Sequence, residues 1–263
     1  MKPIIIALII ACLLISSCDK TVPTQPPEVI EPTPQCPASC DDNDNCTKDF
    51  CSEETNFTCS NTEILGCLEP QVGDYPVAIL SSTGYTSKTG RYFAVGEVEN
   101  LADYNIEGVT IDVEFFNKDN KHIGSSFAKL DMPILFPGQK LPFEADFLEK
   151  SVSNYKLEVS DTQESDWKQY LGFEILNHKS YYEPGLYFSV FGDIRNKFNE
   201  QRDFVDIVAT FYDEQGVVVG MKYAYMDLED FRPGQSFEFE LRFNEPTVIS
   251  KIANYTVQAR SRR

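Results

Sequence analysis

The sequence predicts an all-β protein in which two tandem β-sandwich domains follow a small disulfide-rich N-terminal module. Three observations lead to this fold class. Apolar and polar side chains alternate with the period of two that is typical of strands, from Val109 to Phe115 and from Phe237 to Phe243. The region 96–147 recurs at 192–243 without a gap. Six Cys residues are concentrated in positions 36–67 of the 263-residue chain.

The first 17 residues have the pattern of a secretory signal peptide. Lys2 precedes an apolar stretch, 4–15, that is shorter than the roughly 20 residues a membrane-spanning helix needs. The following Ile-Ser-Ser-Cys, residues 15–18, resembles the lipobox of prokaryotic lipoproteins. This resemblance implies cleavage after residue 17 and attachment of lipid to Cys18. The other interpretation is an ordinary signal peptide cut elsewhere, which would leave Cys18 as an unpaired thiol.

Residues 18–35 are predicted to form a lipid-anchored, Pro-rich linker. They show no apolar periodicity, and their five prolines are Pro23, Pro26, Pro27, Pro32 and Pro34. Proline-rich chain favours the extended polyproline conformation, which rises about 3.1 Å per residue. We therefore expect an exported protein anchored to the membrane, with its body on the extracellular or periplasmic side.

Residues 36–70 are predicted to form a cysteine-rich module. Its six cysteines are Cys36, Cys40, Cys46, Cys51, Cys59 and Cys67. So short an exported segment cannot bury enough apolar surface to fold unaided, so we expect three disulfides, for which 15 pairings are possible. Zinc is the alternative ligand for clustered cysteines, although the segment contains no His.

The same module is strongly acidic and resembles an acidic cysteine-rich repeat of secreted and surface proteins of microbes, with the pattern C-D-D-x-x-x-C-T-x-D-x-C. Hard oxygen ligands of the kind that Ca²⁺ accepts gather between its cysteines. They are Asp41, Asp42, Asn43, Asp44 and Asp49. A bound calcium ion is one interpretation, and solvated turn residues are the other. The glycine that an EF-hand loop requires is absent, so this is not that motif.

Three positions match the acceptor pattern for N-glycosylation. They are Asn45, Asn56 and Asn254, each followed two residues later by Thr. In an exported chain these positions are candidates for modification.

The predicted sandwiches occupy residues 73–160 and 165–263. In the core of the repeat, equivalent residues are 96 positions apart, as Pro137-Gly138 and Pro233-Gly234 are, and both dipeptides suit a type II turn. Upstream, the match of Tyr92 with Tyr187 implies one extra residue near Phe191, as a β-bulge would require. Downstream the offset is 100, which indicates a four-residue insertion in a loop of the second copy.

These residues resemble the FxLYD family of immunoglobulin-like envelope domains over roughly 75–159 and 171–259. The pattern G-x-[VI]-x-N, an alternating strand with an aromatic pair, a turn and then Pro-Gly-Gln occurs twice, as GEVEN…FFNKDN…PGQ and GDIRN…FYDEQG…PGQ. The namesake motif departs from the family at Ala209, where Phe is expected, and in copy one, which has Phe-Phe-Asn at 115–117. The resemblance implies two immunoglobulin-like sandwiches and no shared catalytic function.

The net charge argues against nucleic-acid binding, and the sequence contains no recognisable arrangement of catalytic residues. The formal net charge of −18 excludes a basic surface for phosphates. His122 and His178 are unmatched between the copies and are expected at the solvated surface. Asp131 and Asp227 do match, and we expect each to cap a turn just after a strand. We therefore predict that the chain is not an enzyme and has no cofactor, with calcium at the acidic module as the one candidate ion.

A cluster of aromatic residues has two interpretations. Tyr181, Tyr182 and Tyr187, with Trp167 upstream, could stack sugars on an exposed sheet face, or they could pack in a Phe- and Tyr-rich core. The leading hypothesis is a lipid-anchored envelope protein with a non-catalytic binding or scaffolding role and an envelope protein as partner. The alternatives are a carbohydrate- or solute-binding lipoprotein that takes a glycan with the help of calcium, and an accessory subunit of a surface complex.

Overall fold

A computed structural model describes residues 35–37, 39–40, 42, 47–63, 67–72, 74–148, 151–167 and 172–261. The predicted signal peptide, Cys18 and nearly all of the linker lie outside these residues. The chain from Cys36 onward belongs to one compact unit. Over the described ranges, no helix is both long enough and apolar enough to cross a membrane.

Two disulfides and one hairpin organise the N-terminal part of this unit. Strand β1 (Thr47–Phe50) pairs antiparallel with β2 (Ser60–Glu63). Disulfides join Cys36 to Cys51 and Cys40 to Cys59. These bonds confirm the predicted disulfide-rich segment and reduce the possible pairings.

The remaining two cysteines give a testable prediction. Cys46 lies outside the described residues, and Cys67 is the first residue of strand β3 (Cys67–Val72). Because the other four are paired, we expect Cys46 and Cys67 to form the third disulfide. A non-reducing digest analysed by mass should contain this cross-linked pair of peptides, and Cys46→Ser should expose one titratable thiol, at Cys67. Two free thiols in the unmodified protein would contradict the prediction.

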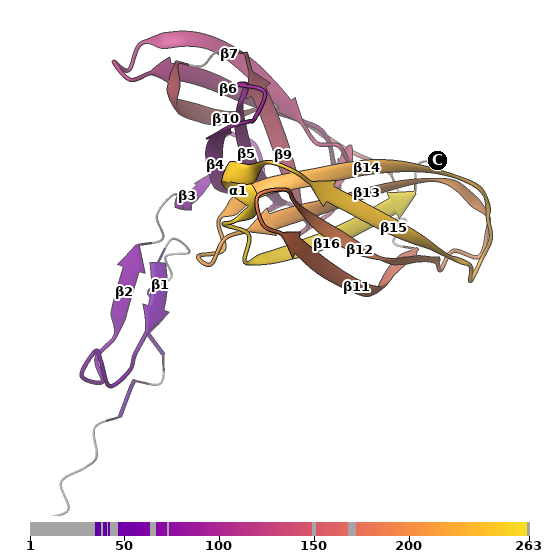
Figure 1. Cartoon of the computed structure of the whole chain (residues 1–263), viewed down its shortest axis with the longest axis horizontal. Coiled ribbons are helices and arrows are strands. Elements are labelled where there is room, and N and C mark those ends of the chain that lie inside the picture. The colour runs from indigo at the N-terminus through magenta and orange to yellow at the C-terminus, as the bar shows by residue number, and fades with distance from the viewer. Residues whose placement is uncertain are drawn as a thin grey trace, which may run out of the picture. The chain divides into compact units, whose positions relative to one another are not determined.

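The first sandwich consists of two antiparallel sheets (Figure 1). One sheet has the order β3-β4-β5-β9, so β3 pairs with this sandwich although it begins within the range predicted for the module. The other has the order β10-β6-β7, with β8 paired to β6. The strands after β3 are β4 (Val77–Thr86), β5 (Tyr92–Asn100), β6 (Ile106–Asn117), β7 (His122–Lys129), β8 (Ile134–Leu135), β9 (Lys140–Phe147) and β10 (Val152–Glu164).

The second sandwich repeats this arrangement. Its sheets have the orders β11-β12-β15 and β14-β13-β16, which correspond strand by strand to β4-β5-β9 and β7-β6-β10. The elements are β11 (Phe173–Glu183), β12 (Tyr187–Asn196), β13 (Arg202–Tyr212), β14 (Val218–Phe231), β15 (Ser236–Phe243), helix α1 (Pro246–Ile249) and β16 (Asn254–Ser261). The predicted all-β class with two immunoglobulin-like sandwiches is confirmed.

Alternating apolar residues form the two cores as the sequence predicted. Residues 109, 111, 113 and 115 of β6 are all buried, as are their equivalents 205, 207, 209 and 211 of β13. Each core also contains a glycine that makes room for an aromatic ring. A Cβ at Gly124 would collide with the ring of Phe147, and a Cβ at Gly220 would collide with that of Phe243. This close approach explains why glycine occurs at both positions.

The repeated Asn and the repeated Pro-Gly-Gln turn form one structural motif. The Asn100 side chain donates to the carbonyl oxygens of Tyr104 and Leu135, at 2.8 and 2.9 Å, and accepts the N–H of Ala102 at 2.8 Å. The Asn196 side chain makes the equivalent three bonds in the second sandwich. In both copies the backbone carbonyl of this Asn accepts the N–H of the turn glycine.

The turn geometry agrees with the sequence. Gly138 and Gly234 have φ values of +67° and +80°, and the N–H of Gln139 bonds the carbonyl of Phe136 at 2.9 Å. A positive φ at the third turn residue defines a type II turn and requires glycine there. The sequence motifs shared by the two copies are therefore explained by folding.

The predicted extra residue in β12 is wrong. Tyr92 lies opposite Phe147 and Phe188 lies opposite Phe243, so Tyr92 corresponds to Phe188 and the offset stays at 96. The irregularity lies in the neighbouring strand β11, where two residues stand opposite Gly192. A Cβ at Gly192 would meet the backbone of His178 at 2.9 Å, so the bulged strand approaches β12 too closely for a side chain.

The downstream insertion is confirmed. Tyr155 lies opposite Phe115 and Tyr255 lies opposite Phe211, so these equivalent tyrosines are 100 residues apart. The connection between β15 and β16 contains the short helix α1, Pro246–Ile249. Its two buried residues, Val248 and Ile249, pack against the core.

Candidate binding surface

The two sandwiches pack against each other through one sheet face from each. The Tyr212 hydroxyl of the second sandwich donates to the Glu97 carboxylate of the first at 2.6 Å. The backbone N–H of Val218 donates to the Ser81 hydroxyl at 3.2 Å. These bonds join the sheet β4-β5-β9 to the sheet β14-β13-β16.

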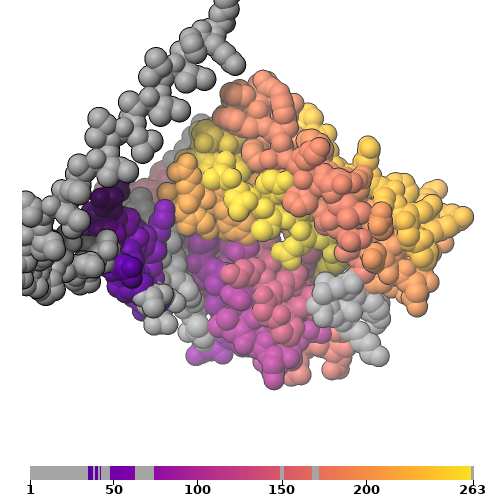
Figure 2. Space-filling view, turned by 90° about the horizontal axis from the view of Figure 1, so that it is seen from below, coloured from indigo at the N-terminus to yellow at the C-terminus, as the bar shows by residue number. Residues whose placement is uncertain are grey.

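Further contacts extend the same interface. Gln258 accepts from the Gln139 side chain at 2.8 Å and donates to the carbonyl of Lys140 at 2.7 Å. In Figure 2 the yellow C-terminal part of the second sandwich adjoins the magenta part of the first. The Tyr85 ring stacks on Phe93 at 5.3 Å between centroids and meets the edge of Phe243 at 6.5 Å. Hydrogen bonds and aromatic packing thus both hold the sandwiches together.

The face of β4-β5-β9 that contacts the second sandwich is here termed the covered face. It is made of the side chains that point away from the core of the first sandwich, namely Tyr85, Phe93, Val95, Glu97 and Glu144. Val95 is fully buried, and Tyr85 is 7% exposed. Burial on the outer side of a sheet is explained here by the second sandwich, because the inner side already packs on its own core.

The repeat gives the covered face a counterpart on the second sandwich, here termed the open face. The equivalents lie 96 residues downstream on β11, β12 and β15, namely Tyr181, Ser189, Phe191, Asp193 and Glu240. Tyr181 is 49% exposed and Phe191 is 40% exposed. Two equivalent faces therefore have opposite environments within the described part of the chain: one is buried by the neighbouring sandwich, and the other presents its aromatic rings to solvent.

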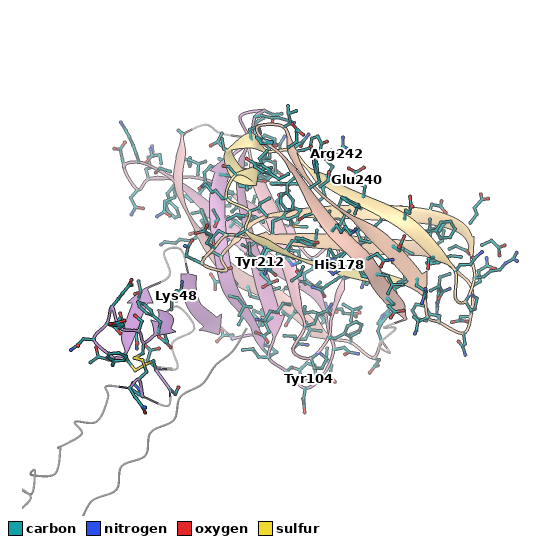
Figure 3. The ribbon with its side chains drawn as sticks, turned by 60° about the horizontal axis from the view of Figure 1, so that its bottom comes forward. Lys48, Tyr104, His178, Tyr212, Glu240 and Arg242 are labelled. Carbon is teal, nitrogen blue, oxygen red and sulfur yellow. A yellow bond between two sulfur atoms is a disulfide. The ribbon has the colours of Figure 1, made fainter. Side chains whose placement is uncertain are left out.

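Side chains at the rim fix the geometry of the open face. The guanidinium of Arg242 lies over the ring of Tyr187 at 4.3 Å, and the rings of Tyr187 and Tyr181 are 6.1 Å apart. Arg242 also pairs with Glu240 at 2.8 Å, and Figure 3 labels both side chains. The Ser189 hydroxyl donates to Glu240 at 2.9 Å. Hydrogen bonds from Arg242 and Ser189 lower the pKa of Glu240, which keeps a fixed charge beside the aromatic rings.

A hollow of about 610 Å³ continues this surface between β12 and β15. Phe191, Asp193 and Glu240 line it, together with Asn177 of the bulged strand β11. The exposed aromatic rings can contact apolar surface of another molecule, and the Arg242–Glu240 pair beside them can contact its polar groups. The open face thus places exposed aromatic rings beside charged side chains and a hollow.

The structure brings together part of the predicted aromatic cluster. Tyr181 and Tyr187 share the open face, whereas Tyr182 lies opposite Phe188 on the other side of the sheet and is 42% exposed at the strand end. Trp167 follows β10, where its backbone N–H donates to the Ser165 hydroxyl at 3.3 Å. Sequence reasoning missed Phe191, which comparison of the two copies at an offset of 96 could have found.

The acidic module is only partly described. The N–H of Asp42 donates to the Asp49 carboxylate at 3.2 Å, and Asn61 donates to Asp42 at 2.6 Å. The other predicted calcium ligands, Asp41, Asn43 and Asp44, lie outside the described residues. Within the described ranges, no three His, Cys, Asp or Glu side chains are grouped as a metal site would require. Calcium binding stays a prediction.

Two of the three glycosylation candidates can be located. Asn56 is exposed in a turn with a φ of +53°, and Asn254 is exposed at the start of β16, where its side chain accepts the N–H of Tyr255. Asn45 lies outside the described residues. Modification at these positions stays a prediction.

Both histidines are exposed, as the sequence predicted. His122 bonds the Ser125 hydroxyl and His178 bonds the Tyr255 hydroxyl, each at 3.0 Å. They lie on different sandwiches, so they do not combine into one site.

The interpretation of Asp131 and Asp227 as equivalent strand-end residues is wrong for the second. Asp131 follows the end of β7, but Asp227 lies inside β14, which continues to Phe231. In the first copy the equivalent segment forms two separate strands, β7 and β8, whereas in the second copy it forms the single strand β14. A shared Asp therefore does not mark a shared turn.

A half-buried carboxyl on the covered face, that of Glu144, makes the stability depend on pH. Burial, helped by the charges of Asp131 and Asp146, raises the pKa of Glu144 to about 7, although the Tyr85 hydrogen bond and Lys222 act in the opposite direction. Unfolded Glu ionises near 4.5, so between 4.5 and about 7 the folded form keeps a proton that the unfolded form loses. The free energy of unfolding should therefore fall as pH rises through this window.

The matched variant is Glu144→Gln, which removes this titration. We expect the stability of the variant relative to the natural protein to increase from about pH 5 to about pH 8 in urea unfolding. The same difference at both pH values would show that the pKa of Glu144 is not raised in the folded protein.

Comparisons with known proteins assign the chain to no family. No family model and no curated protein matches the chain. Among solved structures, the exo-chitosanase CsxA of Amycolatopsis orientalis is 13% identical over 71% of this chain and 25% of its own, with a TM-score of 0.24. A glycosyl hydrolase family 2 member from Bacteroides cellulosilyticus is 12% identical over 59% and 24%, with a TM-score of 0.22. The chain spans about a quarter of each, and likenesses this weak carry no argument about activity.

Proposed function

We propose that this chain is an exported, lipid-anchored envelope protein whose paired sandwiches form a non-catalytic binding unit. The observation that carries the proposal is the contrast between equivalent tyrosines. Tyr85 is 7% exposed under the second sandwich, while Tyr181 is 49% exposed on the open face. The covered face already packs against the second sandwich, and the equivalent open face is available to a partner.

The residues of the open face support binding. Tyr and Arg are enriched at the energetically important centres of protein interfaces, and the open face offers Tyr181, Tyr187 and Arg242 close together. Arg242 and Glu240 hold each other in place before a partner arrives, which reduces the entropy lost on binding. The sandwich pair acts as a support that holds this surface on the anchored chain.

Anchoring through Cys18 gives a direct cellular test. Cys18→Ser should release the protein from the membrane into the surrounding fluid. Serine has no thiol to take the lipid, and the signal peptide does not stay on the exported protein. Cys12→Ser is the matched control, because Cys12 lies within the predicted signal peptide and should leave anchoring unchanged. Retention of Cys18→Ser at the membrane would overturn the anchoring proposal.

The binding surface is tested by placing a photo-cross-linking amino acid at position 181 in intact cells. We expect an intermolecular adduct from position 181. Glu54 is the control position, because it is also exposed but lies in the turn between β1 and β2, outside both sandwiches. An absence of adducts from 181, or the same adducts from both positions, would contradict a binding role for the open face. A single abundant foreign protein in the adduct would make the chain an accessory subunit of that complex.

Carbohydrate binding is the second candidate function. The neighbouring Tyr181 and Tyr187 rings, with Glu240 and Arg242 beside them, offer stacking and hydrogen bonding to a sugar. Saturable binding of purified envelope glycans, weakened about tenfold or more by Tyr181→Ala, would favour it. Repeating the titration with a calcium chelator would test whether the acidic module takes part.

A further inference from the structure

We infer that the partner of the open face is a second copy of this chain, docked head to tail through the outer face of its β6, β7 and β10 strands. The inference rests on the proposed function of the open face as a binding surface. It adds the identity and orientation of the partner.

The first step is the asymmetry of the interface inside the chain. The covered face of the first sandwich contacts the outer face of β13, β14 and β16 on the second, as the Tyr212–Glu97 bond shows. Two different faces therefore meet, which is a heterologous contact. In a protein made of two equivalent sandwiches, such a contact leaves two faces without a partner inside the chain. One is the equivalent of the covered face on the second sandwich, and the other is the equivalent of the β13-β14-β16 face on the first.

The second step locates the other unused face. The side chains of the second sandwich that point toward the first include Val208, Thr210, Met221, Tyr223 and Gln258. Their equivalents on the first sandwich form what is here termed the rear face. It consists of Asp112, Glu114, Ser125, Phe127 and Glu158, with Lys156 between them. A single chain thus carries an open face and a rear face that correspond to the two halves of an interface it already forms.

The rear face has features of a contact surface. Phe127, the equivalent of Tyr223, is 60% exposed, and the Lys129 ammonium lies 5.7 Å from its ring. A hollow of about 460 Å³ on this face is lined by Phe127, Asp112 and Lys156 among others. An exposed ring beside mixed charges matches the character of the open face, where Tyr181 and Phe191 lie beside Arg242.

The differences between equivalent residues predict the strength of the contact. Val208 and Met221 of the internal interface are replaced by Asp112 and Ser125 on the rear face. Less apolar surface is buried and charges must be desolvated, so association between copies should be weaker than the internal contact and reversible. Because the contact is heterologous, it does not end at two copies but continues into a ring or a row.

The test uses two variants that each destroy one face at an exposed position. Phe191→Asp disables the open face, and Phe127→Asp disables the rear face; both are made in the Cys18→Ser chain so that no lipid drives association. Sedimentation velocity should show concentration-dependent dimers and larger assemblies for the parent. Each variant alone should associate about tenfold or more weakly.

The mixture of the two variants is decisive. Phe191→Asp keeps its rear face and Phe127→Asp keeps its open face, so an equimolar mixture should form dimers that grow no further. Dimers of either variant alone that form as readily as those of the parent would indicate a symmetric contact and overturn the inference. A parent that stays monomeric at every concentration would also overturn it.

The two proposals can fail separately. If the parent is monomeric but position 181 still cross-links to a glycan or a foreign protein in cells, the open face binds and only the second-copy partner is wrong. If neither self-association nor any adduct from position 181 is found, the proposed function itself fails.

Discussion

Val95→Asp is expected to lower the free energy of unfolding by about 3 kcal/mol or more. Val95 is fully buried on the covered face, and its neighbour in register across the sheet is Glu144. A new carboxylate at this position loses its water and lies beside the half-buried carboxyl of Glu144. Urea unfolding of the purified chain measures the loss, which should be accompanied by separation of the two sandwiches.

The matched control is Phe191→Asp, the same substitution at the equivalent position of the open face. Phe191 is 40% exposed, so its replacement should cost less than about 1 kcal/mol. The account therefore predicts a large difference between two positions that the repeat makes equivalent. Equal losses in the two variants would show that the covered face is not buried by the second sandwich.

Asn100→Ala is the second substitution expected to have a large effect, with a loss of about 3 kcal/mol. The Asn100 side chain is 1% exposed and satisfies the carbonyls of Tyr104 and Leu135 and the N–H of Ala102. Alanine leaves these backbone groups without their partner, and each buried unsatisfied group costs about 1 to 3 kcal/mol. Thermal or urea unfolding measures the change.

Asn154→Ala serves as the control for this prediction. Asn154 is exposed, and its side chain accepts only the N–H of the adjacent Tyr155 among the bonds that the structure shows. Its replacement should change stability by less than about 0.5 kcal/mol. Asn196→Ala should match Asn100→Ala, because Asn196 makes the same three bonds. A small effect in both Asn variants would mean that water replaces the amide in the folded protein.

Much of the fold could be predicted because local patterns and the repeat agree. Alternation from Val109 to Phe115 marks a strand with one buried side, and the same alternation at 205–211 marks its counterpart. The constant offset of 96 required the two copies to share their strand order. Where backbone irregularity intervened, the prediction failed: the bulge lies in β11 rather than β12, and β14 stays whole where β7 ends.

The covered face was harder to predict, because alternation identifies the core side of a strand and not what covers its other side. One signal was present. The second copy reads Phe-Val-Asp-Ile-Val-Ala-Thr-Phe at 204–211, a nearly continuous apolar run, whereas the equivalent 108–115 alternates with Asp and Glu. A strand buried on both sides has this appearance. The difference between copies, rather than their similarity, indicated the interface.

The candidate site illustrates the same limit. The sequence indicated Tyr181 and Tyr187 as aromatic residues that could bind a ligand, but favoured packing in the core. Only the register of β11, β12 and β15 places them on one outer face with Phe191 and Arg242. Exposure depends on what the neighbouring sandwich covers, and that is a property of tertiary packing.

The most direct test of the central claim is hydroxyl-radical footprinting of the two equivalent tyrosines. In dilute purified protein, the account predicts slow oxidation of Tyr85 and fast oxidation of Tyr181, in line with their exposed fractions of 7% and 49%. On intact cells, where the partner is present, Tyr181 should become protected while Tyr85 stays protected. Equal oxidation of both residues in the dilute protein, or unchanged oxidation of Tyr181 on cells, would contradict the account.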